Sequence, residues 1–209
     1  MKEARLYEPQ TDNKVRCFLC AHRCLIQDGK RGICGVRENQ GGTLYTLVYD
    51  TLIAAHVDPI EKKPFYHVLP GSRSFSIATV GCNFDCQHCQ NHDIAQMPKA
   101  HPGEIPGNRR SPEAIVDAAL RNHCESIAYT YTEPTIFFEL AYDTARLAHA
   151  QGLKNLFVTN GYMTKEALDM IQPYLDGANV DLKGFDDAKY LQLCGGKLGP
   201  VKETIQRMR

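Results

Sequence analysis

Three cysteines lie close together near the middle of the chain, at Cys82, Cys86 and Cys89. Their C-x3-C-x2-C spacing allows one loop to present three thiolates. Such a set can hold three corners of a cubane iron–sulfur cluster and leave the fourth iron without a local protein ligand. Zinc is the alternative, because His88 or His92 could supply the fourth ligand of a tetrahedral site. The position of this loop, directly after a predicted strand, favours the cluster.

Four further cysteines lie near the N-terminus, at Cys17, Cys20, Cys24 and Cys34. Four thiolates can close a tetrahedral zinc site or hold an auxiliary iron–sulfur cluster, and their spacing does not separate these two alternatives. His22 is another candidate ligand. A closed set of four ligands leaves no open coordination position, so we expect a structural rather than a catalytic metal here.

Polar residues follow each of four predicted strands, at 74–80, 126–131, 155–159 and 178–182. The strand predictions rest mainly on β-branched and aromatic content. In β/α barrels the chemistry lies on loops that leave the carboxyl ends of the strands. Besides the cysteine loop, the strand ends carry these candidate site residues: Thr132, Glu133, Asn160, Asp181 and Lys183. A plainer alternative exists for Glu133, which could be an acidic residue favoured by the dipole at a helix N-terminus.

Helices are predicted between these strands. Ser111 is a suitable N-cap with Pro112 in the first turn, and apolar residues recur at helical spacing through 135–151. Thr164 is predicted to cap a shorter helix. The segment 97–110 is rich in proline and glycine and is predicted to be a long loop. Strands separated by single helices imply parallel βα units, in an open sheet or a β/α barrel.

The composition excludes several classes of protein. The 209 residues include 24 basic and 24 acidic side chains, and this balance argues against a partner such as nucleic acid. No apolar run is long enough to span a membrane, and residues 1–13 contain no apolar segment of a secretory signal. The nine cysteines are an odd number. We therefore expect a soluble cytoplasmic protein with reduced thiols, in which Cys124 is a core residue and Cys194 has no assigned role.

The cysteine loop and the strand ends together resemble the radical S-adenosylmethionine (SAM) superfamily. Thr132-Glu133-Pro134 is similar to the family's Gly-Gly-Glu segment, with Tyr131 and Thr132 in place of the glycines. The Asp181-Leu182-Lys183 run is similar to that of pyruvate formate-lyase activating enzymes. The N-terminal cysteines and the segment 58–67 more closely resemble the radical SAM component of the AmmeMemoRadiSam system.

The resemblance implies roles for the candidate residues. The open iron of a [4Fe–4S] cluster would be chelated by the amino and carboxylate groups of SAM. Glu133 would pair with the methionine ammonium, and Lys183 would supply positive charge to the carboxylate. Asn160 and Asp181 would bind the ribose hydroxyls, or Asp181 would hold a cation beside the carboxylate. His88 would pack on the adenine.

The resemblance also implies a fold and a reaction. We expect an α/β fold, with an N-terminal cysteine-rich module at 1–73 and a radical SAM core at 74–209. The core would hold about four of the six βα units of the family's partial barrel, so that the chain is a fragment or is completed by another chain. Reductive cleavage of SAM would give a 5′-deoxyadenosyl radical that takes hydrogen from a substrate. A flavodoxin or ferredoxin would supply the electron, and a protein glycine is one candidate substrate. The rival readings are a non-catalytic zinc or iron–sulfur module and an inactive truncated product.

Overall fold

The computed structural model describes all of residues 1–209, and a five-stranded sheet forms its centre. Its strand order is β13-β12-β11-β9-β8. Four neighbouring strands run parallel to one another: β9 (Arg73–Ala78), β11 (Ser126–Tyr129), β12 (Lys154–Thr159) and β13 (Gly177–Val180). These are the four strands that the sequence predicts. Residues of β11 such as Ile127 and Tyr129 are fully buried, as is usual for strands in the interior of a parallel sheet.

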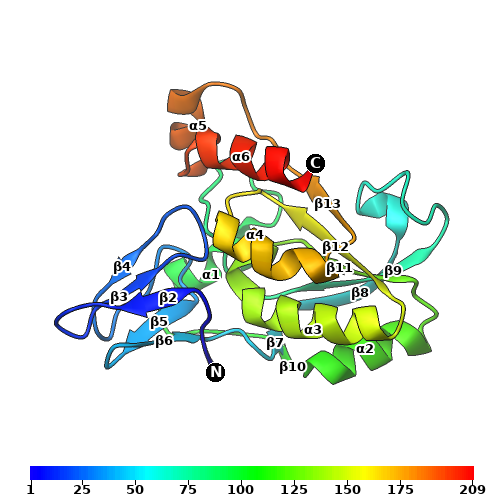
Figure 1. Ribbon diagram of the computed structural model, residues 1–209, viewed down its shortest axis with the longest axis horizontal. Coiled ribbons are helices and arrows are strands. Elements are labelled where there is room, and N and C mark those ends of the chain that lie inside the picture. The colour runs from blue at the N-terminus through cyan, green and yellow to red at the C-terminus, as the bar shows by residue number, and fades with distance from the viewer.

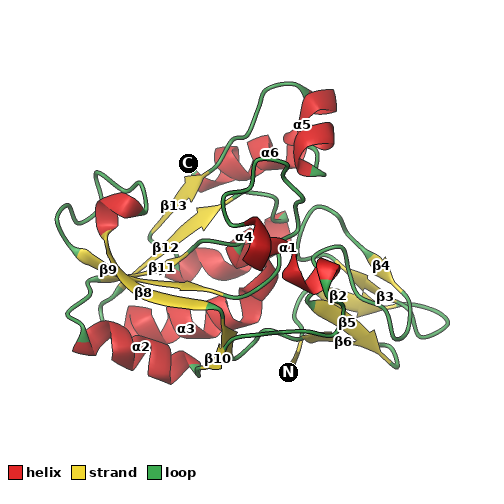
Figure 2. Ribbon diagram, turned by 180° about the vertical axis from the view of Figure 1, so that it is seen from behind, coloured by secondary structure: helices red, strands yellow, loops and turns green.

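Helices α2 (Pro112–Arg121), α3 (Phe138–Ala150) and α4 (Lys165–Ile171) lie together on one face of this sheet (Figures 1 and 2). The sequence predicts all three, and the predicted caps are present. Ala114 N donates to Ser111 Oγ at 3.3 Å, and Ala167 N donates to Thr164 Oγ1 at 3.2 Å. The 3-10 turn η2 (Pro134–Phe137) leads into α3. Apolar side chains of the helices and the sheet form one continuous core.

The N-terminal part of the chain forms small antiparallel sheets. One joins β2 (Tyr7–Pro9), β3 (Val15–Cys17) and β4 (Leu25–Ile26). Another joins β1 (Lys2–Glu3), β6 (Thr43–Thr46) and β5 (Arg37–Gln40). Both lie to one side of the main sheet, near α1 (Figures 1 and 2). A two-stranded ribbon pairs β7 (Thr51–Leu52) with β10 (Asn108–Arg109).

The fifth strand of the main sheet comes from the N-terminal side of residue 73. Strand β8 (Ala54–Pro59) pairs antiparallel with β9 from Ala54↔Ala78 to Pro59↔Arg73. It is followed by the 3-10 turn η1 (Ile60–Lys62). The main sheet therefore includes residues from both sides of the predicted boundary at 73, and that boundary stays a prediction.

Three helices lie near the carboxyl ends of the parallel strands or follow them: α1 (His92–Ala100), α5 (Asp187–Cys194) and α6 (Leu198–Met208). Helix α1 corrects the start of the loop predicted over 97–110, because the helix continues through Pro98 to Ala100, whereas residues 101–107 hold no helix or strand. Pro98 is buried and lies close to Gly35: a Cβ added to Gly35 would be 3.0 Å from Pro98 Cβ. Packing therefore outweighs the one backbone hydrogen bond that a proline in the last turn removes. No helix is both long and apolar enough to cross a membrane.

Candidate functional site

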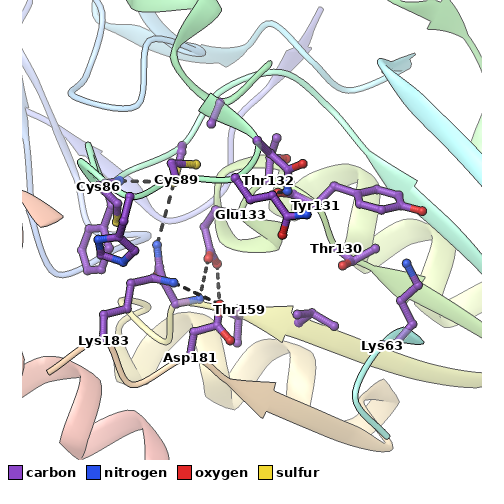
Figure 3. A pocket seen from close by; sticks show the side chains of 18 of the residues that line it. Lys63, Cys86, Cys89, Thr130, Tyr131, Thr132, Glu133, Thr159, Asp181 and Lys183 are labelled. Atoms are coloured by element: carbon purple, nitrogen blue, oxygen red, sulfur yellow. Dashed lines mark hydrogen bonds and ion pairs between the residues drawn. The ribbon is translucent and has the colours of Figure 1, made fainter. Parts of the chain in front are cut away.

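A cavity of about 630 Å³ lies at the carboxyl ends of the parallel strands (Figure 3). The strands β9, β11, β12 and β13 each end just before one of the segments that line it, so parallel pairing brings these segments together. All eight residues that the sequence places at strand ends are among its lining: Cys82, Cys86, Cys89, Thr132, Glu133, Asn160, Asp181 and Lys183. His88 also lines the cavity, whereas the exposed His92 does not.

Glu133 is the most enclosed charged group of the cavity, with 1 % of its surface exposed. Its Oε1 accepts hydrogen bonds from Thr135 N (3.0 Å), Thr135 Oγ1 (2.6 Å) and Thr159 Oγ1 (2.7 Å). Its Oε2 accepts from Asn160 N at 2.8 Å. The residue caps η2, as the plainer alternative predicts, and it lines the cavity as well. Burial raises the pKa of Glu133 despite these donors.

Tyr131 stands where the Gly-Gly-Glu segment has a glycine, and its backbone still adopts a conformation typical of glycine. Its φ is +62°, a left-handed conformation that glycine adopts without steric cost. The Tyr131 hydroxyl donates to Asp58 Oδ2 at 2.5 Å, and Asn91 Nδ2 donates to the Tyr131 carbonyl at 2.7 Å. Thr132 Oγ1 donates to the Thr79 carbonyl at 2.8 Å. These contacts hold a glycine-like backbone in place with ordinary side chains.

Asn160, Asp181 and Lys183 come from the next two strand ends. Asn160 Nδ2 donates to Asn83 Oδ1 at 2.7 Å and lies 3.9 Å from Cys82 Sγ. Lys183 Nζ lies 3.0 Å from Asp181 Oδ2. Burial opposes the charge on Lys183, but Asp181 and the neighbouring thiols outweigh burial and raise its pKa. The wall near the cysteines thus combines a cation, a carboxylate and an amide.

The thiols of Cys82 and Cys86 have raised pKa values. Burial raises the pKa of Cys82 to about 12, and it also raises the pKa of Cys86. A metal that binds here must therefore displace protons from these thiols, which is the usual coupling between metal and thiolate. Three thiols on one loop, in a cavity of a size that suits a small-molecule ligand, fit a cluster together with a cofactor.

The match to known proteins agrees with this geometry. The family model described as the radical SAM superfamily matches residues 76–209, which is more than half of the chain. The chain belongs to the radical SAM superfamily. The matched region contains all eight of the cavity residues at the strand ends, and the family implies a [4Fe–4S] cluster and SAM as cofactors.

Several relatives come from Methanocaldococcus jannaschii. An uncharacterized protein is 46% identical over 206 residues, which are 99% of this chain and 60% of that protein. A second uncharacterized protein is 24% identical over 89% of this chain and 49% of its own length. A third, provisionally named a glycyl-radical enzyme activating enzyme, is 28% identical over 60% of this chain and 46% of its own length. The chain thus spans no more than 60% of these relatives.

A structure of TYW1 with a lysine–pyruvate adduct bound is also similar. It is 17% identical, with a TM-score of 0.44, over 70% of this chain and 54% of that chain.

The four N-terminal cysteines of this radical SAM protein also lie together. Cys17, Cys20, Cys24 and Cys34 line a second, much smaller cavity with Arg37. Burial raises the pKa of Cys34 to about 11 and raises that of Cys20 further. The four cysteines therefore face one small cavity, and a metal bound there stays a prediction.

His22, the alternative ligand at the N-terminal site, does not line that cavity. Its Nε2 lies 2.8 Å from the Asn83 carbonyl, and its ring packs edge-on against Tyr162 at 4.8 Å between centroids. Ala21 N donates to the Tyr162 carbonyl at 3.0 Å, and Cys20 forms a β-bridge with Met163. His22 therefore connects the N-terminal cysteines to the loop that carries Cys82.

Cys194 lies beside the cysteine loop, a contact that the sequence did not reveal. It is fully buried at the end of α5, and its sulfur lies within 4.8 Å of the ligand atoms of Cys86 and His88. Asp85 N donates to the Cys194 carbonyl and Gln87 N to the Leu193 carbonyl, each at 2.9 Å. The two segments are far apart in the sequence, so no local spacing could have indicated the contact.

Gly196 allows this approach, and we expect Gly196→Ala to be destabilising. A Cβ at residue 196 would lie 2.2 Å from Cε1 of Phe84, which is buried within the cysteine loop. Overpacking of this kind costs about 1–3 kcal/mol in the free energy of unfolding, measured by urea denaturation. Gly199→Ala is the control, because a Cβ there meets nothing within 4 Å and α6 favours alanine. Equal stability of the two variants would show that the loop can move away.

Proposed function

We propose that this chain is the cofactor-binding part of a radical SAM enzyme with a partial (β/α) barrel. Cys82, Cys86 and Cys89 would hold a [4Fe–4S] cluster, and SAM would fill the adjoining cavity. With both bound, they would supply one-electron reductive cleavage of the sulfonium carbon–sulfur bond, which would give methionine and a 5′-deoxyadenosyl radical able to take hydrogen from a substrate. The observation that supports this proposal most is the meeting of the three thiols, Glu133 and Lys183 at one cavity.

The chain's own residues would bind SAM by complementary charge. Glu133 Oε1 already accepts three hydrogen bonds, whereas Oε2 accepts one from Asn160 N and retains capacity for the methionine ammonium. Lys183 would face the methionine carboxylate, and Asn160 and Asp181 would bind ribose hydroxyls. Enclosure of Glu133 strengthens such a pairing, because water competes little for a buried carboxylate.

The finer assignment is to the activating-enzyme branch, in the radical SAM component of the AmmeMemoRadiSam system. It rests on the Asp58–His67 segment, the N-terminal cysteines and the relative provisionally named an activating enzyme. The N-terminal cysteines would bind zinc or an auxiliary cluster. We propose a flavodoxin or ferredoxin as electron donor, and a protein glycine is a candidate substrate by analogy with that relative.

Anaerobic reconstitution with iron and sulfide tests the proposal. We expect iron and sulfide to bind in near-equal amounts, and the reduced protein to give an EPR signal that changes when SAM is added. Zinc in place of iron, or a reduced cluster whose signal ignores SAM, would favour the non-catalytic metal module instead. The whole enzyme's turnover is tested with the longer relative, since this chain spans 60% of it.

Glu133→Gln should weaken SAM binding by about 10- to 150-fold, since hydrogen bonds to charged groups contribute about 1.5–3 kcal/mol. Equilibrium binding of labelled SAM measures the effect, with exposed Glu203→Gln as the control.

Because burial raises the pKa of Glu133, the carboxylate loses its proton only at a pH above its ordinary value of 4.5. SAM affinity should therefore rise with pH through that range in the wild type and stay flat in Glu133→Gln. Equal SAM affinity of the wild type and Glu133→Gln would show that Glu133 does not bind SAM.

A further inference from the structure

The cavity has a second charged wall, formed by residues just after β8. Lys62 and Lys63 both line it, and Figure 3 shows Lys63 on the opposite side of the cavity from Cys86, Cys89 and Lys183. The roles proposed for SAM use the cysteine side of the cavity and leave this wall unassigned. The charge of this wall is therefore available to a second molecule bound beside SAM.

The two lysines share a single carboxylate. Lys62 Nζ lies 2.8 Å from Asp58 Oδ1, and Lys63 Nζ lies 2.8 Å from Asp58 Oδ2. Asp58 Oδ2 also accepts the Tyr131 hydroxyl at 2.5 Å. Burial opposes ionisation of Asp58, but its hydrogen bonds from Lys62, Lys63 and Tyr131 hold its pKa well below the usual range. Two ammonium groups against one carboxylate leave one unit of positive charge on this wall.

The Lys63 ammonium is a buried charge, because its side chain is only 2% exposed. Its Nζ lies 4.1 Å from the centre of the Tyr131 ring. Burial lowers the pKa of Lys63, and Asp58 opposes this only in part. An anion that enters the cavity would recover part of the desolvation cost of the ammonium, since charge-assisted hydrogen bonds are stronger where water is excluded.

A purely structural role explains only part of this arrangement. Asp58, Lys63 and the Tyr131 hydroxyl hold Tyr131 in its left-handed conformation, whereas Lys62 bonds the other oxygen of Asp58 and does not contact the Tyr131 hydroxyl. Lys62 instead lies where the cavity joins a neighbouring hollow of about 440 Å³, because Lys62, Asn91 and Tyr131 line both. The exposed Lys62 at the junction and the buried Lys63 behind it form a path of positive charge into the cavity.

We propose that Lys62 and Lys63 bind the carboxylate or phosphate group of a small anionic substrate, which is the alternative to a protein glycine. This inference rests on the proposed function, since it places the substrate across the cavity from SAM. Lysine is a common ligand for both groups, and only a small group can reach the enclosed Lys63. Held there, the substrate's anionic group would be fixed, and a carbon beyond it would point toward the cofactor side, which is the positioning that radical transfer requires.

Labelling with pyridoxal 5′-phosphate tests this assignment without any turnover. This anionic aldehyde condenses with a lysine amine to an imine and water, and borohydride reduces the imine to a stable amine that peptide mass spectrometry locates. We expect label on Lys62 or Lys63 at least about tenfold above that on the exposed Lys202, with pyridoxal, which lacks the phosphate, giving no such preference. Added inorganic phosphate or acetate should protect, and the more effective of the two identifies the preferred anion.

Two variants complete the test. In Lys62→Gln, the label on Lys63 and the protection by anions should both fall about tenfold, while Lys202→Gln leaves them unchanged. Lys62 is 61% exposed, so its replacement should not prevent folding, and a thermal melt checks this. Equal labelling of Lys62, Lys63 and Lys202, or labelling that ignores phosphate and acetate, would overturn the inference. Because labelling needs no cluster, that result is distinct from a failure to reconstitute one.

Discussion

Replacing Cys86 with alanine is expected to abolish the SAM-sensitive EPR signal of the reconstituted chain. With two thiols left on the loop, the proposed cluster loses one of its three protein ligands. Cys194 lies close to Cys86 but comes from α5, where Asp85 N donates to the Cys194 carbonyl and Gln87 N donates to the Leu193 carbonyl, so it is not part of the three-thiol loop. Bound iron should fall by about four atoms per chain, while any metal at the N-terminal cysteines stays.

Cys124→Ala is the matched control for this prediction. Cys124 is as buried as Cys86, yet it precedes β11, at the end of the sheet opposite the cavity. Its replacement should leave both the iron content and the EPR signal unchanged. A SAM-sensitive signal that survives in Cys86→Ala would contradict the ligand assignment. A signal lost in both variants would point to a general loss of stability instead.

The strand ends could be predicted from the sequence because local patterns determine them. Each parallel strand is a short β-branched or aromatic run followed at once by polar residues, as in Val158-Thr159-Asn160. Once the strands are parallel and adjacent, their polar ends meet by geometry alone. The same local logic placed the caps at Ser111 and Thr164.

The remaining parts of the cavity depend on contacts between distant segments. Strand β8 belongs to the segment that the sequence assigns to the N-terminal module, yet it supplies Asp58, which holds Tyr131 in its left-handed conformation. Cys194 meets Cys86 only because α5 ends at Gly195 and turns back onto the cysteine loop. No spacing rule reports such pairings, because they depend on how complete elements pack.

The N-terminal region is joined to the sheet by charge as well as by apolar packing. Arg37 of β5 and Glu139 of α3 are both buried, with 1 % and 0 % of their surfaces exposed. Arg37 Nη2 lies 2.5 Å from each Glu139 oxygen, and Arg5 N donates to Glu139 Oε1 at 2.6 Å. Arg37 Nη1 also lies 4.0 Å from Cys17 Sγ. The pair thus connects the four-cysteine cavity to the helix that packs on β11 and β12.

Glu139→Gln should therefore lower the free energy of unfolding by about 3–5 kcal/mol, because it leaves the Arg37 charge buried without its partner. Glutamine keeps the size of the side chain, so the loss would report charge rather than volume. Urea denaturation followed by circular dichroism measures the change. Glu166→Gln breaks the exposed pair with Arg23, where Nη2 lies 3.0 Å from Oε1, and should cost less than about 1 kcal/mol. Similar losses in the two variants would mean that the buried pair is solvated or compensated. A large loss confined to Glu139→Gln would show that the buried pair between Arg37 and Glu139 stabilises the contact of the N-terminal sheets with α3.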